Sequence, residues 1–321
     1  MSGNIFQPEL QDIRPAPENP SSTNSPKSGK PRITDVGFTA SDRMYVTLDG
    51  CGDFSLRKTF DCGQTFRFDE IPCREAPDAV SVFGNAFGRW IQFTQIGDRL
   101  ILTGTTPDEY ETIWKPYLDF DEDYAAADEA ILAAMPSDGY RETMSRAVGY
   151  GRGIRILRQD PFETLISFIV SQNNNIPRIK KIITALCENY GENRAFPTPE
   201  ALAGASVDDL FALRTGFRAK YIHDAAVKVA SGEVNLSEIA ACKDYGKCTE
   251  MLCRIHGVGP KVSSCVLLFG FHKTEAFPVD VWMKKSLARH FPDGFVPAPL
   301  GRYKGLCQQY LFYYERWGDG T

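Results

Sequence analysis

The sequence has no apolar run of membrane-spanning length, and its first residues lack the charged-then-apolar pattern of a secretory signal. Its nine cysteines are scattered over 321 residues, whereas disulfide frameworks are typical of short secreted chains. We therefore expect an intracellular protein with reduced thiols and no membrane partner.

Metal-ligand patterns are also missing. Cys242, Cys248 and Cys253 are close in sequence but have no fourth cysteine nearby, which argues against an iron–sulfur cluster. No pair of histidines has the spacing of a zinc site; the four are His223, His256, His272 and His290. The chain gives no indication of an organic cofactor either.

Positive charge is scarce overall but unevenly distributed. The net charge is −5, which alone argues against a nucleic-acid partner. Residues 1–150 carry 14 Lys and Arg against 24 Asp and Glu, whereas residues 151–321 carry 22 against 17. This asymmetry suggests that the C-terminal part faces a polyanion, although solvated helix faces produce similar imbalances.

Three segments follow one another along the chain. Residues 1–31 are rich in Pro, Ser and Asn and predict a disordered tail. Residues 32–122 begin with short alternating runs that predict an antiparallel sheet: 44–50, 65–71, 79–84, 89–97 and 99–105. From residue 107 onward the apolar spacing is helical, in runs at 107–118, 123–135, 161–172, 177–191, 206–214, 218–230 and 244–256. We expect an α+β protein whose helical domain, 123–321, has two lobes.

The most informative stretch is 252–291. Gly257, Val258 and Gly259 form a tight turn between two apolar segments, and the glycines permit positive φ and close backbone approach. Two helices joined in this way form a helix-hairpin-helix, in which backbone N–H groups at the start of the second helix, near Pro260, hold a DNA phosphate. The simpler interpretation is an ordinary turn between helices.

Two reactive side chains accompany the hairpin. Lys261 lies just after the turn, and Asp280 follows 19 residues later, behind Pro278 and Val279. Burial and nearby positive charge favour the neutral amine, which attacks carbon. A carboxylate stabilises the sugar cation that forms when a glycosidic bond breaks. The pair therefore predicts covalent chemistry on a nucleotide, whereas an ordinary surface lysine needs no such aspartate.

Two further segments have side chains that could bind a DNA duplex from which a base has been extruded. Three asparagines, 173–175, precede Arg178, and their amides bond to base edges or phosphates unless they only cap helices. Gly216, Phe217 and Arg218 place an aromatic ring beside a guanidinium, which suits filling the space left by an extruded base. The simpler interpretation of Phe217 is a core residue at a helix start.

The remaining candidates are a glycine and a helix face. Gly63, within the sheet region, permits close approach of a flat ligand, although a β-bulge explains it equally. Gln308 and Phe312 are four residues apart and share a helix face. The glutamine could form hydrogen bonds with a base edge while the phenylalanine stacks on the ring. Alternatively, both belong to a C-terminal core helix.

Together, these segments resemble the 8-oxoguanine DNA glycosylase/AP lyases of the helix-hairpin-helix superfamily, in the same order over residues 35–321. The resemblance implies that Lys261 attacks C1′ and forms a Schiff base, that Asp280 supports this attack, and that β-elimination then nicks the strand. It implies an orphan-cytosine site and wedge made of Asn173, Arg178, Phe217 and Arg218, and a damaged-base pocket made of Gly63, Cys265, Gln308 and Phe312.

The same resemblance implies that the carbonyls of Cys253, Ile255 and Val258 hold a structural cation that bridges to a phosphate. It implies a monomer that acts on double-stranded DNA with 8-oxoguanine opposite cytosine. It also implies an intracellular location, in the compartment that holds the DNA. Trp282 departs from the family, in which a histidine lies near the phosphates; Phe217 replaces a tyrosine.

Two other interpretations remain. One is another glycosylase of the superfamily, against which the lysine, the missing cysteine cluster and the β-rich N-terminal part argue. The other is a non-catalytic DNA-binding module, which would need neither Asp280 nor the pocket residues.

Overall fold

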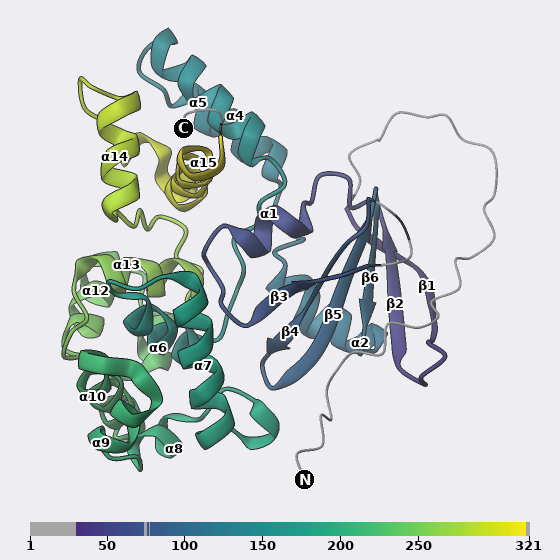
Figure 1. Ribbon diagram of the computed structural model, residues 1–321. Helices are drawn as coiled ribbons and strands as arrows, with labels where there is room; N and C mark the ends of the chain where they lie inside the picture. Colours follow the sequence, from purple (N-terminus) through teal and green to yellow (C-terminus); the bar gives the residue numbers. More distant parts are fainter. Residues whose placement is uncertain (1–29, 74–75, 77, 319–321) are drawn as a thin grey trace.

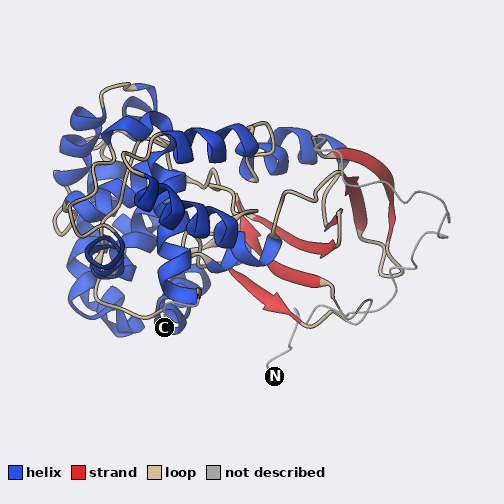
Figure 2. Ribbon diagram, turned by 90° about the horizontal axis from the view of Figure 1, so that it is seen from above, coloured by secondary structure: helices blue, strands red, loops and turns tan. Residues whose placement is uncertain are grey.

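A computed structural model describes residues 30–73, 76 and 78–318. A β-sheet lies at one end of the molecule, and the helices gather at the other (Figure 2). The helices form two groups, one with α4, α5, α14 and α15 and one with α6 to α13 (Figure 1). The predicted α+β class with a two-lobed helical region is therefore confirmed.

The sheet is antiparallel throughout the described residues, with the strand order β1-β2-β6-β5-β4-β3. Its strands are β1 (Arg32–Phe38), β2 (Met44–Asp49), β3 (Phe68–Ile71), β4 (Val80–Ala86), β5 (Arg89–Ile96) and β6 (Arg99–Thr103). The inward residues of the sheet pack against Trp114 and Tyr117, which come from the turns that follow β6. Trp114 Nε1 donates to Thr105 Oγ1 at 2.9 Å, so the buried indole keeps a polar partner.

Two elements of the sheet domain were not predicted. The edge strand β1 is largely exposed on both faces, so it shows no apolar alternation. Helix α1 (Leu56–Asp61) has only six residues, too few to show a helical period. The predicted run at 107–118 is helical but irregular: α2 (Pro107–Glu109), a π-helical turn η1 (Tyr110–Trp114) and α3 (Lys115–Tyr117).

The helical part contains the predicted helices and several more. Those that bear on the site are α4 (Tyr124–Ala133), α5 (Asp138–Gly151), α6 (Pro161–Ser171), α7 (Ile176–Tyr190), α10 (Ala219–Ala230), α12 (Tyr245–Cys253), α13 (Pro260–Phe269), α14 (Val281–His290) and α15 (Lys304–Trp317). Shorter helices complete the lobes: α8 (Pro199–Ala203), α9 (Val207–Leu210), α11 (Leu236–Ala241), and the turns η2 (Glu192–Arg194), η3 (Phe211–Thr215), η4 (Gly216–Arg218) and η5 (Ala298–Tyr303).

Helix α5 escaped prediction because it contains three glycines, which lower helix propensity. One of them serves packing: a Cβ at Gly151 would lie 2.5 Å from the ring of Tyr310, so glycine lets α5 approach α15. The tail predicted for residues 1–31 lies outside the described residues except at its last two positions. The domain division at 122/123 stays a prediction.

Candidate active site

The helix-hairpin-helix consists of α12, a turn and α13. Gly257 has φ +82°, and a Cβ there would lie 2.4 Å from the ring of Tyr221, so both conformation and space require glycine. Gly259, the N-cap of α13, has φ −106° and does not use the left-handed region that the sequence suggested. Apart from its chain neighbours, no atom of the described residues lies within 4 Å of a Cβ built at Gly259, so the space on that side of the turn is open.

Lys261 occupies the second position of α13, which begins at Pro260 as predicted. Its side chain is half-buried, and its Nζ lies 5.5 Å from the centroid of the Phe168 ring, where the π-face attracts a cation. The hairpin therefore places the lysine directly after the glycine turn.

Asp280 is the N-cap of α14, a role that the sequence analysis did not assign to it. Its Oδ1 accepts the Met283 N–H at 2.8 Å. The N-terminal end of the helix dipole also stabilises a carboxylate. One oxygen is thereby held by the backbone, and the other remains available for chemistry.

A cavity of about 70 Å³ brings the two reactive residues together with all four predicted base-pocket residues. The predicted residues that line it are Lys261, Asp280, Gly63, Cys265, Gln308 and Phe312. Sequence reasoning missed Cys62, Phe168, Phe269, Pro278 and Gln309, which also line it. Cys62, Pro278 and Gln309 gave a signal, since they lie within two residues of predicted ones; Phe168 and Phe269 belong to runs that resemble core.

Gly63 faces Phe312 across this cavity. It has φ +79°, and a Cβ there would lie 3.7 Å from the Phe312 ring, so a side chain would be strained and would project toward the aromatic wall. Burial raises the pKa of the Cys265 thiol to about 11, although the charge of Lys261 opposes this rise. The thiol therefore stays protonated near neutral pH and acts as an apolar wall.

The two glutamines of α15 are buried side by side. Gln309 Nε2 donates to Gln308 Oε1 at 2.8 Å, which orients the Gln308 amide at the cavity wall. The helix on which Gln308 and Phe312 were expected to share a face is confirmed as α15, and both residues line the cavity.

The asparagine turn lies between α6 and α7, as expected. Asn175 caps α7 by accepting the Arg178 N–H at 3.0 Å, and Asn173 has φ +47°. Within the described part of the chain, the Arg178 guanidinium makes one long hydrogen bond, 3.4 Å, to the Arg214 carbonyl, so it can turn toward a ligand.

The segment Gly216–Arg218, predicted to form the wedge, lies against this turn. Phe217 is 53% exposed and edge-on to Tyr221, which fits a side chain that enters a base stack and excludes the simpler interpretation as core. Arg218, however, is 2% exposed and donates to the carbonyls of Gln172 and Asn173. In this arrangement it braces the asparagine turn, and it must leave these carbonyls to reach a base.

Among the described residues, no three His, Cys, Asp or Glu side chains gather as they would around a metal ion. In the same part of the chain, none of the helices combines the length and apolarity needed to cross a membrane.

Comparison with known proteins agrees with this geometry. Residues 50–165 match the family described as "8-oxoguanine DNA glycosylase, N-terminal domain", and residues 166–294 match "HhH-GPD superfamily base excision DNA repair protein". The N-glycosylase/DNA lyase of Saccharomyces cerevisiae is 40% identical over 159 residues, which are 44% of this chain and 42% of that protein. The match therefore spans less than half of the yeast relative.

Two further comparisons cover most of the chain. The N-glycosylase/DNA lyase OGG1 of Arabidopsis thaliana is 33% identical over 298 residues, 82% of this chain and 78% of that protein. A structure of the Clostridium acetobutylicum 8-oxoguanine glycosylase/lyase with double-stranded DNA containing cytosine opposite 8-oxoG has a TM-score of 0.76 and 34% identity, covering 88% of this chain and 98% of that one. The chain therefore belongs to the 8-oxoguanine DNA glycosylase family, DNA N-glycosylase/AP lyases of the HhH-GPD superfamily.

Proposed function

We propose that this protein removes 8-oxoguanine opposite cytosine from duplex DNA and then nicks the strand, acting as a monomer at the site of the DNA. The observation that carries the proposal is the single cavity in which Lys261 and Asp280 meet Gly63, Gln308 and Phe312. A base inside a duplex cannot reach such a cavity, so the damaged nucleotide must be flipped out of the stack.

In the proposed chemistry, the neutral Lys261 amine attacks C1′ of the flipped nucleotide. The C1′–N9 bond breaks, and the base leaves with the bonding electrons and takes up a proton. The attached nitrogen then loses a proton as the C1′–O4′ bond breaks, O4′ leaves with the bonding electrons and takes up a proton, and the opened sugar is held as an imine. Removal of a proton from C2′ breaks the C3′–O bond, and the strand is nicked. The second carboxylate oxygen of Asp280, which the cap leaves free, supports the positive charge at C1′.

Lesion recognition would come from opposite walls of the cavity. The Gly63 carbonyl would accept the N7–H that 8-oxoguanine has and guanine lacks. Phe312 and Cys265 would sandwich the ring, and the Gln308 amide, fixed by Gln309, would read the Watson–Crick edge. Each of these groups lines the same cavity as Lys261.

The opposite cytosine would be held by Asn173, Arg178 and Arg218, while Phe217 fills the vacated space. A bidentate arginine–base pair contributes roughly 1–3 kcal/mol of discrimination. Arg178 is free to make this contact, and Arg218 would exchange its carbonyl partners for the base.

We also propose a cation at the hairpin, held by the carbonyls of Cys253, Ile255 and Val258. The Ile255 carbonyl accepts the Val258 N–H at 3.0 Å. Because a carbonyl has two lone pairs, this bond leaves one free for an ion. Carbonyl oxygens suit hard cations, so the donors fit; such an ion would supply positive charge next to a DNA phosphate.

Borohydride trapping tests the function directly. The substrate is a duplex with one 8-oxoguanine opposite cytosine, and the proteins are the wild type, Lys261→Gln and Lys247→Gln. Lys247 is an exposed lysine on the first hairpin helix and serves as the matched control. We expect a covalent adduct with the wild type and Lys247→Gln only.

Two other results would contradict the proposal. Free base released without an adduct would mean that water, not Lys261, displaces the base. Neither adduct nor release would mean that the substrate is another lesion or that the chain only binds DNA.

A further inference from the structure

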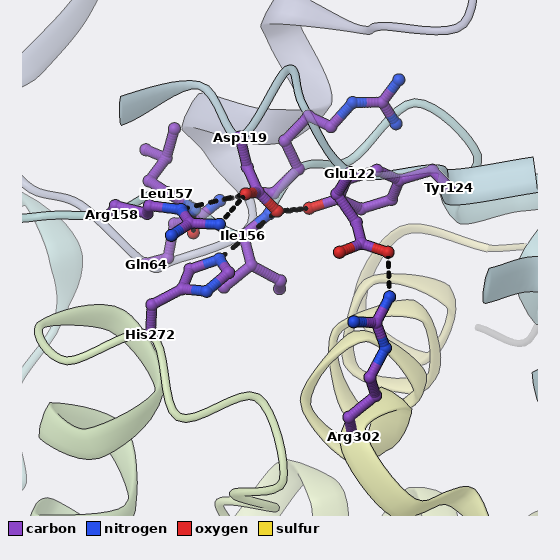
Figure 3. A network of polar contacts seen from close by, with 10 residues as sticks. Gln64, Asp119, Glu122, Tyr124, Ile156, Leu157, Arg158, His272 and Arg302 are labelled. Atoms are coloured by element: carbon purple, nitrogen blue, oxygen red, sulfur yellow. Dashed lines mark hydrogen bonds and ion pairs between the residues drawn. The ribbon is translucent and has the colours of Figure 1, made fainter. Parts of the chain in front are cut away.

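The segment 154–159 links α5 to α6 as an extended, largely buried chain that pairs with none of the described strands. Three of its backbone N–H groups bond to side chains, and the other three bond to the backbone carbonyls of Gly151, Tyr117 and Phe269. Arg155 N donates to Thr59 Oγ1 at 3.2 Å. Ile156 N donates to Tyr124 Oη at 2.8 Å and Leu157 N to Gln64 Oε1 at 2.9 Å, residues that Figure 3 shows side by side. The position of this segment therefore depends on a few side chains from the sheet domain and from α4.

Gln64 does most to join the segment to the sheet domain. It is 1% exposed, and its Nε2 donates to the Thr59 carbonyl at 2.9 Å and to the Arg155 carbonyl at 2.8 Å. Its Oε1 accepts the Leu157 N–H. The Gly63 carbonyl belongs to the peptide bond that joins Gly63 to Gln64. The hydrogen bonds of the Gln64 side chain therefore hold this peptide in place.

Gln159 joins the same loop to the catalytic hairpin. Its Nε2 donates to the Gln64 carbonyl at 2.8 Å, and its backbone N–H donates to the Phe269 carbonyl at 3.0 Å. Phe269 is the last residue of α13, the helix that carries Lys261 near its start. One residue thus bridges the Gly63 loop and the helix of the nucleophile.

We propose that Gln64 and Gln159 are positioning residues that determine lesion specificity by fixing the Gly63 carbonyl relative to Lys261. This inference rests on the proposed function of Gly63 as the acceptor of the N7–H of 8-oxoguanine. Gly63 has no side chain of its own to hold it, and it adopts a left-handed conformation. The direction of its carbonyl therefore depends on the bonds made by the next residue.

An abasic site provides the discriminating substrate. It has no base to present to Gly63, yet its C1′ still reacts with Lys261. Loosening the Gly63 loop should therefore slow excision of 8-oxoguanine and leave cleavage of an abasic site intact. A role in overall stability would affect the two substrates equally.

The experiment compares single-turnover rates on 8-oxoguanine opposite cytosine and on an abasic site for Gln159→Met and Gln64→Met. The control is Gln92→Met, which removes a buried glutamine of β5 whose Nε2 donates to Ser81 Oγ at 3.1 Å. We expect Gln159→Met to lose about tenfold in 8-oxoguanine excision, the effect of one lost hydrogen bond, with unchanged abasic-site cleavage. The control should retain both rates.

Equal losses on both substrates in Gln159→Met, or no loss on either, would overturn the inference while leaving the proposed function intact. If Gln64→Met does not fold, Gln159→Met decides alone, because it removes a single side-chain bond. A wild type that cleaves abasic sites but does not excise 8-oxoguanine would overturn the proposed function, and this inference with it.

Discussion

The two hairpin glycines should respond oppositely to alanine. Gly257→Ala places a Cβ 2.4 Å from the Tyr221 ring at φ +82°, whereas Gly259→Ala meets no atom within 4 Å at φ −106°. A left-handed alanine costs roughly 1–2 kcal/mol, and overpacking against a ring adds about 1–3 kcal/mol. We therefore expect Gly257→Ala to lower the free energy of unfolding by about 2–5 kcal/mol.

Gly259→Ala should fold as well as the wild type, because an N-cap change of this kind costs at most about 1 kcal/mol. Its new methyl group nevertheless projects from the N-cap where a phosphate would approach, so it should weaken binding to an undamaged duplex. Urea denaturation measures the free energy of unfolding of both variants, and fluorescence anisotropy with a labelled duplex measures the DNA affinity of Gly259→Ala. If Gly257→Ala is as stable as the wild type, or Gly259→Ala is equally destabilised, the reasoning from these contacts is wrong.

Three further substitutions test separate parts of the site. Arg178→Ala should reduce the preference for cytosine over adenine opposite the lesion by roughly tenfold, since one bidentate contact is lost; unchanged relative excision rates would contradict its role. Asp280→Asn should keep the cap of α14, because Asn caps as well as Asp, and should slow base release by about 100-fold or more; near-normal excision with a normal melting temperature would reduce Asp280 to a cap. Burial raises the pKa of Glu163 to about 7 although Arg67 lies 3.3 Å away, so in the folded state this carboxyl stays protonated at pH values where the unfolded one is ionised. The free energy of unfolding should therefore fall as the pH rises from about 4.3 to 7, by at most about 1.4 kcal/mol per unit from this group, and Glu163→Gln should remove that slope in melting curves; an unchanged slope would mean that another group titrates.

The parts of the site that sequence predicts best are those whose function depends on local backbone. A hairpin glycine, a proline in the first turn and a lysine after it are fixed by a dozen neighbouring residues, so Gly257, Pro260 and Lys261 were placed correctly. Gly63 and Phe312 required the resemblance as well, because nothing local brings a sheet-domain loop against the C-terminal helix.

What the sequence could not give is the choice of partner for a polar side chain. Arg218 is as suited to a base as to a carbonyl, and only packing shows that it turns inward to Gln172 and Asn173. Gln64 and Gln159 lie in runs without periodicity, and their importance comes from a segment without a strand partner. Trp282 is 49% exposed with Lys285 Nζ 5.1 Å from its ring centroid, an i, i+3 pair that helical spacing explains once α14 is known.

We expect the sheet domain to contribute to the choice of damaged base, because it supplies the Gly63 loop of the cavity. In the proposed mechanism the hairpin and Lys261 supply the phosphate contact and the nucleophile, whereas the cavity is lined jointly by the Gly63 loop, α13 and α15. Apolar and polar contacts both hold this junction: Phe66 packs edge-on against Phe168 within the helical core, and ion pairs join Arg67 to Glu163 and Lys180 to Asp69 at 2.6 Å. The ion pairs add directional contacts to the apolar packing. If the Gly63 carbonyl reads the lesion as proposed, weakening these contacts should cost discrimination among bases before it costs strand cleavage.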